Sequence, residues 1–358
     1  GSISETRITS RDINSNFYIT FKKDFGDRFN AVLMLGNDVF ERDYEMVNAT
    51  GEDFVIPDFY DLSYTRQISN SQDKRKKRLV GLYGDLMLSY DDILFLNITG
   101  RNDWSSALPK DNNSFFYPSV NLSYVFSENM QLPEFLSFGK LRASWAEVGK
   151  DTHADLIGQT YTSTTIYPLR GQVGFTRYSQ LGDLELKPEL TSSIEFGADL
   201  RFLDSRIGLD ITWYKSNSKD QIIPVPVSDA TGFSTFITNA GEIQNMGWEF
   251  IVRGTPVLTD DFSWSVTFNA SYNENEIVSI REGIDEIVVG SQFGYAGSTV
   301  TMKLIEGEAY GNLFGSSYAR YGTVEGLHLE EDLPIIIGAN GFPVVNNQQL
   351  VLGNATPK

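Results

Sequence analysis

The stretch from Ile194 to Trp213, Ile-Glu-Phe-Gly-Ala-Asp-Leu-Arg-Phe-Leu-Asp-Ser-Arg-Ile-Gly-Leu-Asp-Ile-Thr-Trp, has the clearest residue pattern in the chain. Apolar side chains alternate with polar or small ones up to Phe202, and the same alternation resumes at Ile207. A period of two residues indicates β-strand, because successive side chains point to opposite faces of a sheet. The stretch is therefore predicted to be a hairpin with one apolar and one polar face, closed by a tight turn at residues 203–206.

The same alternation recurs along the chain and predicts ten strands in five hairpins. Short turns alternate with longer connections, the longest being the polar segments 37–77, 149–189 and 216–244. Soluble β-sandwiches do not sort their loops by length in this way, whereas outer-membrane barrels have short periplasmic turns and long extracellular loops. The pattern predicts an all-β fold, a segment of an antiparallel up-and-down transmembrane β-barrel. The expected strands are residues 17–22, 29–35, 79–90, 93–99, 119–126, 138–148, 194–202, 207–213, 248–252 and 262–270.

Composition limits the classes of function that the chain can have. Its 358 residues carry a formal charge of −18, which argues against nucleic acid as a partner because phosphates require Lys and Arg. The basic run at residues 74–78 is interpreted as a solvated turn. The absence of Cys excludes disulfides and thiolate chemistry. No apolar run approaches the roughly 20 residues of a membrane-spanning helix, but a barrel strand needs only about 9–11 alternating residues.

No catalytic or cofactor site is predicted. His153 and His328 lie far apart in the sequence, so a His-based metal site is not expected. Carboxylate pairs such as Asp91-Asp92 are adjacent in turns and lack the two-sided geometry that glycoside hydrolysis needs. The oxygens of residues 111–113 could hold Ca²⁺, although a solvated loop is the preferred interpretation because no spaced series of ligands follows.

The polar face of the predicted strands supplies the first set of candidate site residues. Charged side chains alternate with the apolar ones and would line a wet lumen while the apolar face meets lipid. A closed ladder also pairs every backbone polar group, which lipid requires. The residues predicted to line the lumen are Lys140, Arg142, Glu195, Asp199 and Arg201.

Aromatic residues divide into two groups. Those near strand ends are predicted to form girdles at the membrane interface: Trp213, Trp248, Trp264 and residues 115–117. Those in long loops could instead stack on sugar rings or peptide side chains. The candidate substrate-binding residues are Tyr161, Tyr167 and Tyr178, together with Arg101, Asp103 and Trp104 of a loop expected after residue 99.

The pattern weakens after residue 272. Residues 1–272 are expected to hold the barrel strands and loops, and residues 273–358 a continuing barrel region with a long extracellular loop and few strands. Residues 299–304 are a possible strand. The tail to Lys358, interrupted by Gly and Pro, is interpreted as loop.

Several dispersed motifs resemble the SusC/RagA-type TonB-dependent outer-membrane transporters of Bacteroidetes. The resemblance covers nearly the whole chain, and its motifs follow one another in the order and spacing of that family. They are Gly100-Arg101-Asn102-Asp103-Trp104-Ser105-Ser106, Leu108-Pro109, Tyr117-Pro118-Ser119, Leu136-Ser137-Phe138-Gly139-Lys140-Leu141-Arg142-Ala143-Ser144-Trp145, Leu186-Lys187-Pro188-Glu189, Asn239-Ala240-Gly241-Glu242-Ile243, Asn245-Met246-Gly247-Trp248-Glu249 and Leu352-Gly353-Asn354-Ala355-Thr356-Pro357.

This resemblance implies a location in the cell outer membrane and a set of partners. Such proteins are large plugged barrels, of the class with 22 strands, that the TonB complex drives. A SusD-like surface lipoprotein caps them, and they import oligosaccharides or peptides. The sequence shows no plug domain, no TonB-contacting segment and no final strands, so a barrel segment is expected, with energy coupling in other parts of the protein.

Two other classes of function are compatible with an all-β chain. A soluble glycan-binding or adhesin domain would pack the face of Ile194, Phe196 and Leu200 against a second sheet, whereas a barrel would expose that face. A β-rich hydrolase would need two carboxylates facing each other across a cleft. The burial of the apolar face therefore distinguishes the barrel from the soluble domain.

Overall fold

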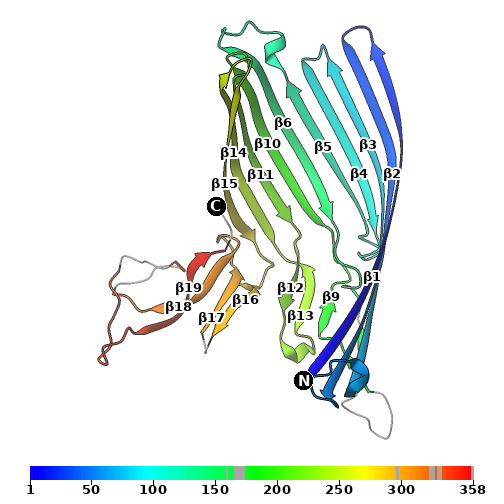
Figure 1. Cartoon of the computed structure of the whole chain (residues 1–358), viewed down its shortest axis with the longest axis vertical. Coiled ribbons are helices and arrows are strands. Elements are labelled where there is room, and N and C mark those ends of the chain that lie inside the picture. Colours follow the sequence, from blue (N-terminus) through cyan, green and yellow to red (C-terminus); the bar gives the residue numbers. More distant parts are fainter. Residues whose placement is uncertain (159, 165–173, 296–297, 322–326, 329–332, 356–358) are drawn as a thin grey trace.

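The computed structural model describes residues 1–158, 160–164, 174–295, 298–321, 327–328 and 333–355. Its main element is a curved ten-stranded sheet in which strands adjacent in the sheet follow one another along the chain (Figure 1). Every pairing in this sheet is antiparallel, so the predicted all-β, up-and-down architecture is confirmed. The ten strands are β1 (Ser2–Phe25), β2 (Phe29–Phe54), β3 (Thr65–Tyr90), β4 (Leu94–Ser105), β5 (Ser114–Tyr124), β6 (Leu136–Lys150), β10 (Glu189–Phe202), β11 (Ile207–Lys219), β14 (Glu242–Leu258) and β15 (Ser263–Ser279).

Connections sort to the two ends of the sheet largely by length. At one end, called the turn end, the hairpins close at residues 26–28, 91–93, 203–206 and 259–262 (top of Figure 1). Asp91 and Asp92 both have positive φ, 53° and 57°, as a tight hairpin turn requires. The opposite, connection end carries residues 55–64, 106–113, 151–188 and 220–241. One turn-end link, residues 125–135, is also long because it contains a short 3-10 helix, η2 (Phe126–Glu128).

The first three strands extend much farther than their sequence pattern predicts. β1 has 24 residues, and β2 and β3 have 26 each, against roughly 9–11 needed to cross a bilayer. The prediction of a long polar connection at residues 37–77 is therefore wrong, because only residues 55–64 connect β2 to β3. The solvated turn expected at residues 74–78 is wrong for the same reason, since these residues lie within β3. Both faces of a strand in water can be polar, so the period of two disappears there.

Smaller sheets fill the connection end. The connection after β6 contains β7 (Tyr161–Thr164), β8 (Gly174–Arg177) and β9 (Gln180–Gly182), and the connection after β11 contains β12 (Ile222–Pro226) and β13 (Thr235–Asn239). β7 pairs with β8, while β12, β13 and β9 form a three-stranded sheet. Within the described part of the chain, no helix is long and apolar enough to cross a membrane.

The C-terminal region contains a separate four-stranded sheet of β16 (Ile287–Tyr295), β17 (Ser298–Leu304), β18 (Asn312–Tyr318) and β19 (Val345–Asn354). The expected strand at residues 299–304 corresponds to β17. The interpretation of the following tail as loop is wrong at β18 and β19, because pairing with distant segments, rather than local alternation, forms these two strands. That residues 273–358 continue a barrel wall stays a prediction.

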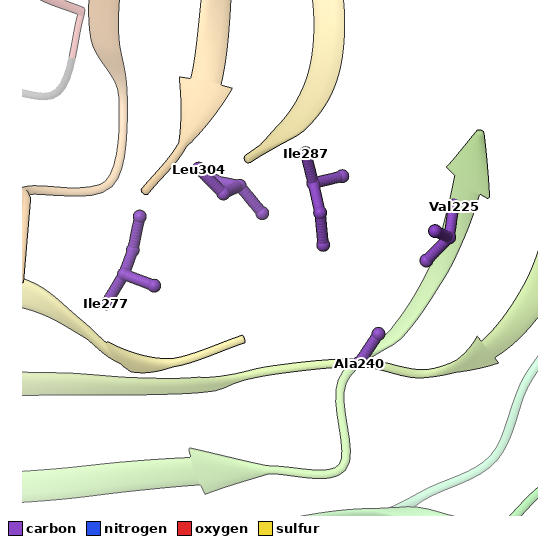
Figure 2. Packing of buried hydrophobic residues seen from close by; sticks show 5 residues of the cluster. All are labelled: Val225, Ala240, Ile277, Ile287 and Leu304. Atoms are coloured by element: carbon purple, nitrogen blue, oxygen red, sulfur yellow. The ribbon is translucent and has the colours of Figure 1, made fainter. Parts of the chain in front are cut away.

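Buried apolar clusters hold the connection end together. Figure 2 shows one cluster, which joins β12, the end of β15 and the C-terminal sheet. A second consists of Leu108, Phe115 and Leu186 and fastens two connections to β5. Among the described residues, buried apolar contacts gather around the connections and in the C-terminal sheet and do not form a layer across the ten-stranded sheet. The residues of the cluster in Figure 2 are Val225, Ala240, Ile277, Ile287 and Leu304.

Candidate functional site

The ten-stranded sheet has an apolar face and a polar face, as its alternating sequence predicts. The apolar face carries Ile194 and Phe196, whose exposed fractions are 42% and 54%. A sandwich would bury these side chains against a second sheet, so the interpretation as a soluble sandwich domain is wrong. Large exposed apolar surface is costly in water and is expected where a sheet meets lipid. Other exposed members of this face are Leu82, Leu122, Leu141, Trp145, Trp248, Val252, Val266 and Phe268.

Residues predicted to line the lumen share the polar face. Strand register places Glu195 opposite Ser144, and Asp199 opposite Lys140. Arg201 lies 3.6 Å from Asp199 and stacks over the ring of Phe138 at 4.6 Å. The structure therefore brings all five predicted residues to one face of neighbouring strands, and their role in lining a lumen stays a prediction. The five are Lys140, Arg142, Glu195, Asp199 and Arg201.

Arg142 shows how the polar face is built. Its guanidinium on β6 crosses the middle strand β10 and donates to Asp210 at 2.7 Å and Thr212 at 3.2 Å on β11. It crosses at Gly197, where an added Cβ would lie 2.9 Å from Arg142 Nε. Glycine at this position therefore lets a long side chain lie flat over the backbone. We call this arrangement a glycine bridge: a side chain that passes over a glycine to a partner two strands away.

Three more glycine bridges follow the same geometry. Each joins a long polar side chain to a partner two strands away, and in each an added Cβ on the glycine would come within 2.7 Å of the crossing side chain. Together the bridges keep long side chains flat against the wall, which leaves the space in front of the polar face open. They are Arg101 on β4 over Gly81 to Asp38 on β2, Tyr83 on β3 over Gly36 to Asn16 on β1, and Tyr214 on β11 over Gly247 to Asn273 on β15.

The Arg101 bridge contains the most buried charge of the sheet. Arg101 Nε donates to Asp103 Oδ1 at 2.8 Å, and the Asp103 side chain is only 5% exposed. The Tyr117 hydroxyl donates to the other Asp103 oxygen, and Arg101 also lies over the ring of Tyr83 at 5.8 Å. The carboxylate of Asp103 is thus held by two donors, and it fixes the position of the arginine.

The motif at residues 100–106 was expected to lie in a loop, but nearly all of it lies in a strand. β4 runs to Ser105, so Arg101 and Asp103 lie within a strand and face the polar side. Trp104 faces the opposite, apolar side, where it lies opposite Val80 of the neighbouring strand β3. The loop position was wrong because the polar residues of this motif serve cross-strand bridges. A substrate-binding role for Arg101, Asp103 and Trp104 stays a prediction.

The aromatic triplet at residues 115–117 also divides between the faces. Phe116 is 60% exposed on the apolar side, whereas Phe115 is buried with Leu108 and Leu186 beneath the connections. Tyr117 bonds to Asp103 on the polar side. The prediction that all three lie at the lipid boundary is therefore wrong for two of them, because consecutive strand residues point to opposite faces.

The other tryptophans predicted for the girdle are on the apolar face. Trp213 stacks on Phe196 with ring centroids 6.0 Å apart, and Trp248 pairs with Trp213 across the strands. Trp264 lies near the turn end and is half exposed. Their girdle role stays a prediction.

The tyrosines of the long connections do not belong to the strands that carry the polar face. Tyr161 starts β7 and is paired in register with Arg177, next to Tyr178. Both tyrosine side chains are more than half exposed. Tyr167 lies outside the described residues. Stacking of these tyrosines on a ligand stays a prediction.

Among the hollows formed by the described residues, three adjoin the polar face or the C-terminal sheet, and sequence reasoning did not identify them. One of about 380 Å³ lies on the polar face and is lined by Asn121, Arg142, Glu195, Thr212 and Glu249. A second, of about 440 Å³, is bounded by Tyr83, Arg101 and Tyr117. The third, of about 670 Å³, lies between the ends of β14–β15 and the C-terminal sheet; its lining includes Glu274, Glu276, Glu308 and His328, and His328 Nε2 is 3.0 Å from Glu308. Glycines at polar-face positions were the one sequence signal for the bridges that border the first two hollows.

Lys77 anchors the longest connection to the sheet. Its ammonium donates to Asp151 Oδ1 at 2.7 Å and to the Thr152 carbonyl at 2.9 Å, and Ser105 also donates to Asp151. We expect Lys77→Gln to loosen residues 151–188 by about 1–2 kcal/mol, since it removes a charged and partly buried hydrogen-bond donor. Limited proteolysis should then cleave this connection roughly tenfold faster. Arg75→Gln, on the same strand, is the control, and equal cleavage of both variants would contradict the anchoring role.

Comparison with known proteins agrees with this architecture. The family model described as "TonB dependent receptor-like, beta-barrel" matches residues 2–329. TonB-dependent receptor P3 of Formosa agariphila is 27% identical over 345 residues, which cover 93% of this chain and 34% of the relative. TonB-dependent receptor SusC of Bacteroides thetaiotaomicron is 27% identical over 286 residues, covering 76% of this chain and 28% of SusC. The chain thus spans about a third of the length of these relatives.

A solved structure shows the same fold. The RagAB peptide importer in its closed-closed state superposes with a TM-score of 0.75 at 18% sequence identity, covering 98% of this chain and 39% of that one. The family match, the sheet topology and the exposed apolar face agree, and the predicted resemblance to SusC/RagA-type proteins is confirmed. The chain belongs to the β-barrel family of TonB-dependent receptors, which reside in the outer membrane.

Proposed function

We propose that this chain forms part of the barrel wall of an outer-membrane transporter that imports oligosaccharides or peptides. The observation that carries the proposal is the contrast between the two faces of one sheet, an exposed apolar face and a polar face held flat by glycine bridges. A wall of this kind separates lipid from a water-filled passage. The hollows on the polar face offer carboxylates, arginines and hydroxyls, which are groups that bind sugar hydroxyls or peptide backbones.

The same proposal assigns two protein partners. A SusD-like surface lipoprotein caps the connection end, where the small sheets and long connections gather. The TonB complex supplies energy through parts of the receptor outside this chain. Support comes from the kinship with SusC and from the fold shared with the RagAB peptide importer. The chain acts in transport and is not itself an enzyme.

Growth on defined nutrients tests this function. Deleting the receptor that contains this chain is expected to abolish growth on one class of oligosaccharide or peptide too large for passive diffusion, and expression of the receptor should restore it. Loss of TonB should give the same defect, because import would no longer be energised. Unchanged uptake of both substrate classes after deletion would contradict the proposal.

A further inference from the structure

The cations at residues 74–78 of β3 are divided between the two faces of the strand. Lys74, Lys76 and Arg78 are alternate residues, so they face the same side of the strand as Val80. Val80 pairs with Trp104 on the apolar face, and Leu82, next on that face, is 51% exposed. The three cations therefore continue the lipid-facing surface beyond its apolar part, toward the connection end.

Two arginines of β1 join these cations on the same face. Strand register aligns Arg11 with Asp43 and Lys76, and it aligns Arg7 with Val47, which lies four residues farther along β2 on the same face. We call the resulting group the basic patch. It comprises Arg7, Arg11, Lys74, Lys76 and Arg78.

Three carboxylates on the strand between them hold the cations in place. Lys76 lies 2.8 Å from Glu41 and 3.4 Å from Asp43, and Arg78 also bonds to Glu41. Glu41 is only 15% exposed, whereas Lys76 and Arg78 are 58% and 57% exposed. The carboxylates thus lie deeper than the cations, and the surface presented outward is positive. The other two pairs are Arg11 with Asp43 at 2.7 Å and Lys74 with Glu45 at 3.2 Å.

The carboxylate of Glu41 keeps its charge at neutral pH. Hydrogen bonds from Lys76 and Arg78 lower the pKa of Glu41, and the same contacts to Glu41 and Asp43 raise the pKa of Lys76. Glu41 and Lys76 therefore both carry their charge around pH 7, and the cations of the patch outnumber the carboxylates between them in a chain whose total formal charge is −18.

The height of the patch matches the headgroup layer of a bilayer. A strand rises about 3.3 Å per residue and is tilted by roughly 45° in a membrane barrel. Arg78 is two residues beyond Val80 and Lys74 is six beyond it, so the three cations lie about 5 to 14 Å past the apolar surface. A headgroup region extends roughly 5–8 Å beyond the hydrocarbon core on each side, and a glycolipid headgroup extends farther.

We propose that the basic patch on the outer face of β1–β3 binds the phosphate groups of lipid headgroups in the outer leaflet of the outer membrane. Charge complementarity and the continuity of the patch with the lipid-facing surface favour a lipid over a protein partner. Both Lys and Arg are suited to phosphate, Lys as a point charge and Arg through its fork of donors. The remaining cations of the run have partners elsewhere, since Lys77 holds Asp151 and Arg75 lies 2.7 Å from Asp73.

Lipid binding by the intact receptor tests this inference. The receptor that contains this chain is placed in phosphatidylcholine nanodiscs with a small fraction of either bis-phosphorylated or dephosphorylated lipid A, and native mass spectrometry counts the lipid A retained. The wild type is expected to prefer the phosphorylated form at least tenfold. No preference in the wild type would overturn the proposal, and this comparison does not depend on the folding of any variant.

A charge-removal variant locates the site. Lys74→Gln/Lys76→Gln/Arg78→Gln should weaken retention of phosphorylated lipid A about ten- to a hundredfold, because each cation near an anionic membrane surface contributes to binding. Lys74→Arg/Lys76→Arg/Arg78→Lys preserves the charge and should retain the lipid. Equal retention by the two variants would overturn the assignment. Loss of a SusD-like protein from the purified complex, with lipid retention unchanged, would instead assign the patch to a protein partner.

Discussion

Replacing Phe196 with Arg should reduce the stability of the barrel in its membrane by about 2–4 kcal/mol, the cost of a cation on the lipid face at the middle of the bilayer. Phe196 is 54% exposed on the apolar face and stacks on Trp213. The variant therefore also loses an aromatic contact. Urea unfolding of the receptor in liposomes would measure the free energy of unfolding, and we expect less folded barrel to accumulate in the outer membrane.

The adjacent residue is a matched control for this substitution. Glu195→Arg introduces the same side chain one position away on β10, but on the polar face, where Glu249 lines the same hollow. Water screens charge there, so we expect a change in the free energy of unfolding within about 1 kcal/mol. If Glu195→Arg were as damaging as Phe196→Arg, or more so, the assignment of the two faces would be wrong.

Removing the Asp103 carboxylate should have the second large effect. Asp103 accepts from both Arg101 and Tyr117, and its side chain is 5% exposed. Asp103→Ala leaves a partly buried guanidinium and a phenol without this acceptor, at a cost of about 2–4 kcal/mol. Chemical denaturation in liposomes measures the loss, and binding of substrate to the receptor would show whether the rearranged Arg101 alters the polar face.

Asp38 is the control for Asp103 because it contacts the same arginine. It lies 3.2 Å from Arg101 and is more exposed, at 31%. Asp38→Ala should therefore cost only about 0–1 kcal/mol, as for other exposed ion pairs. A larger loss from Asp38→Ala than from Asp103→Ala would contradict the central place of Asp103 in this network.

Sequence alone predicted the ten strands of the main sheet and the identity of its faces. This succeeded between Ile194 and Trp213 because a strand between lipid and water must alternate apolar and polar side chains. The same constraint ends where the strand leaves the membrane. Residues 40–54 and 65–78 lie beyond the hydrocarbon layer, where neither face of a strand has to be apolar, so their strand structure comes from pairing with neighbours, which a local pattern does not reveal.

The sequence predicted which face of the sheet carries the polar residues, but it did not predict which residues their side chains contact. Lys140 and Glu195 were assigned to the polar face from their alternation. The partners of the arginines were missed, since Asp210 is 68 residues from Arg142 and Asp38 is 63 residues from Arg101. Gly197, a glycine at a polar-face position, was a sign of such a contact in the sequence. The register between strands decides which side chain passes over it.

Labelling of single cysteines along β10 is the most direct test of the account that this sheet is a wall between lipid and water. The chain contains no cysteine, so in a receptor whose other parts also lack cysteine each residue of 194–202 can be replaced in turn and labelled within the intact membrane. Cysteines at Phe196 and the other apolar-face positions should carry probes that lipid-embedded quenchers reach, while cysteines at Glu195 and Asp199 should react with charged, water-soluble maleimides. The same labelling behaviour at successive positions, or alternation in the opposite phase, would contradict the account.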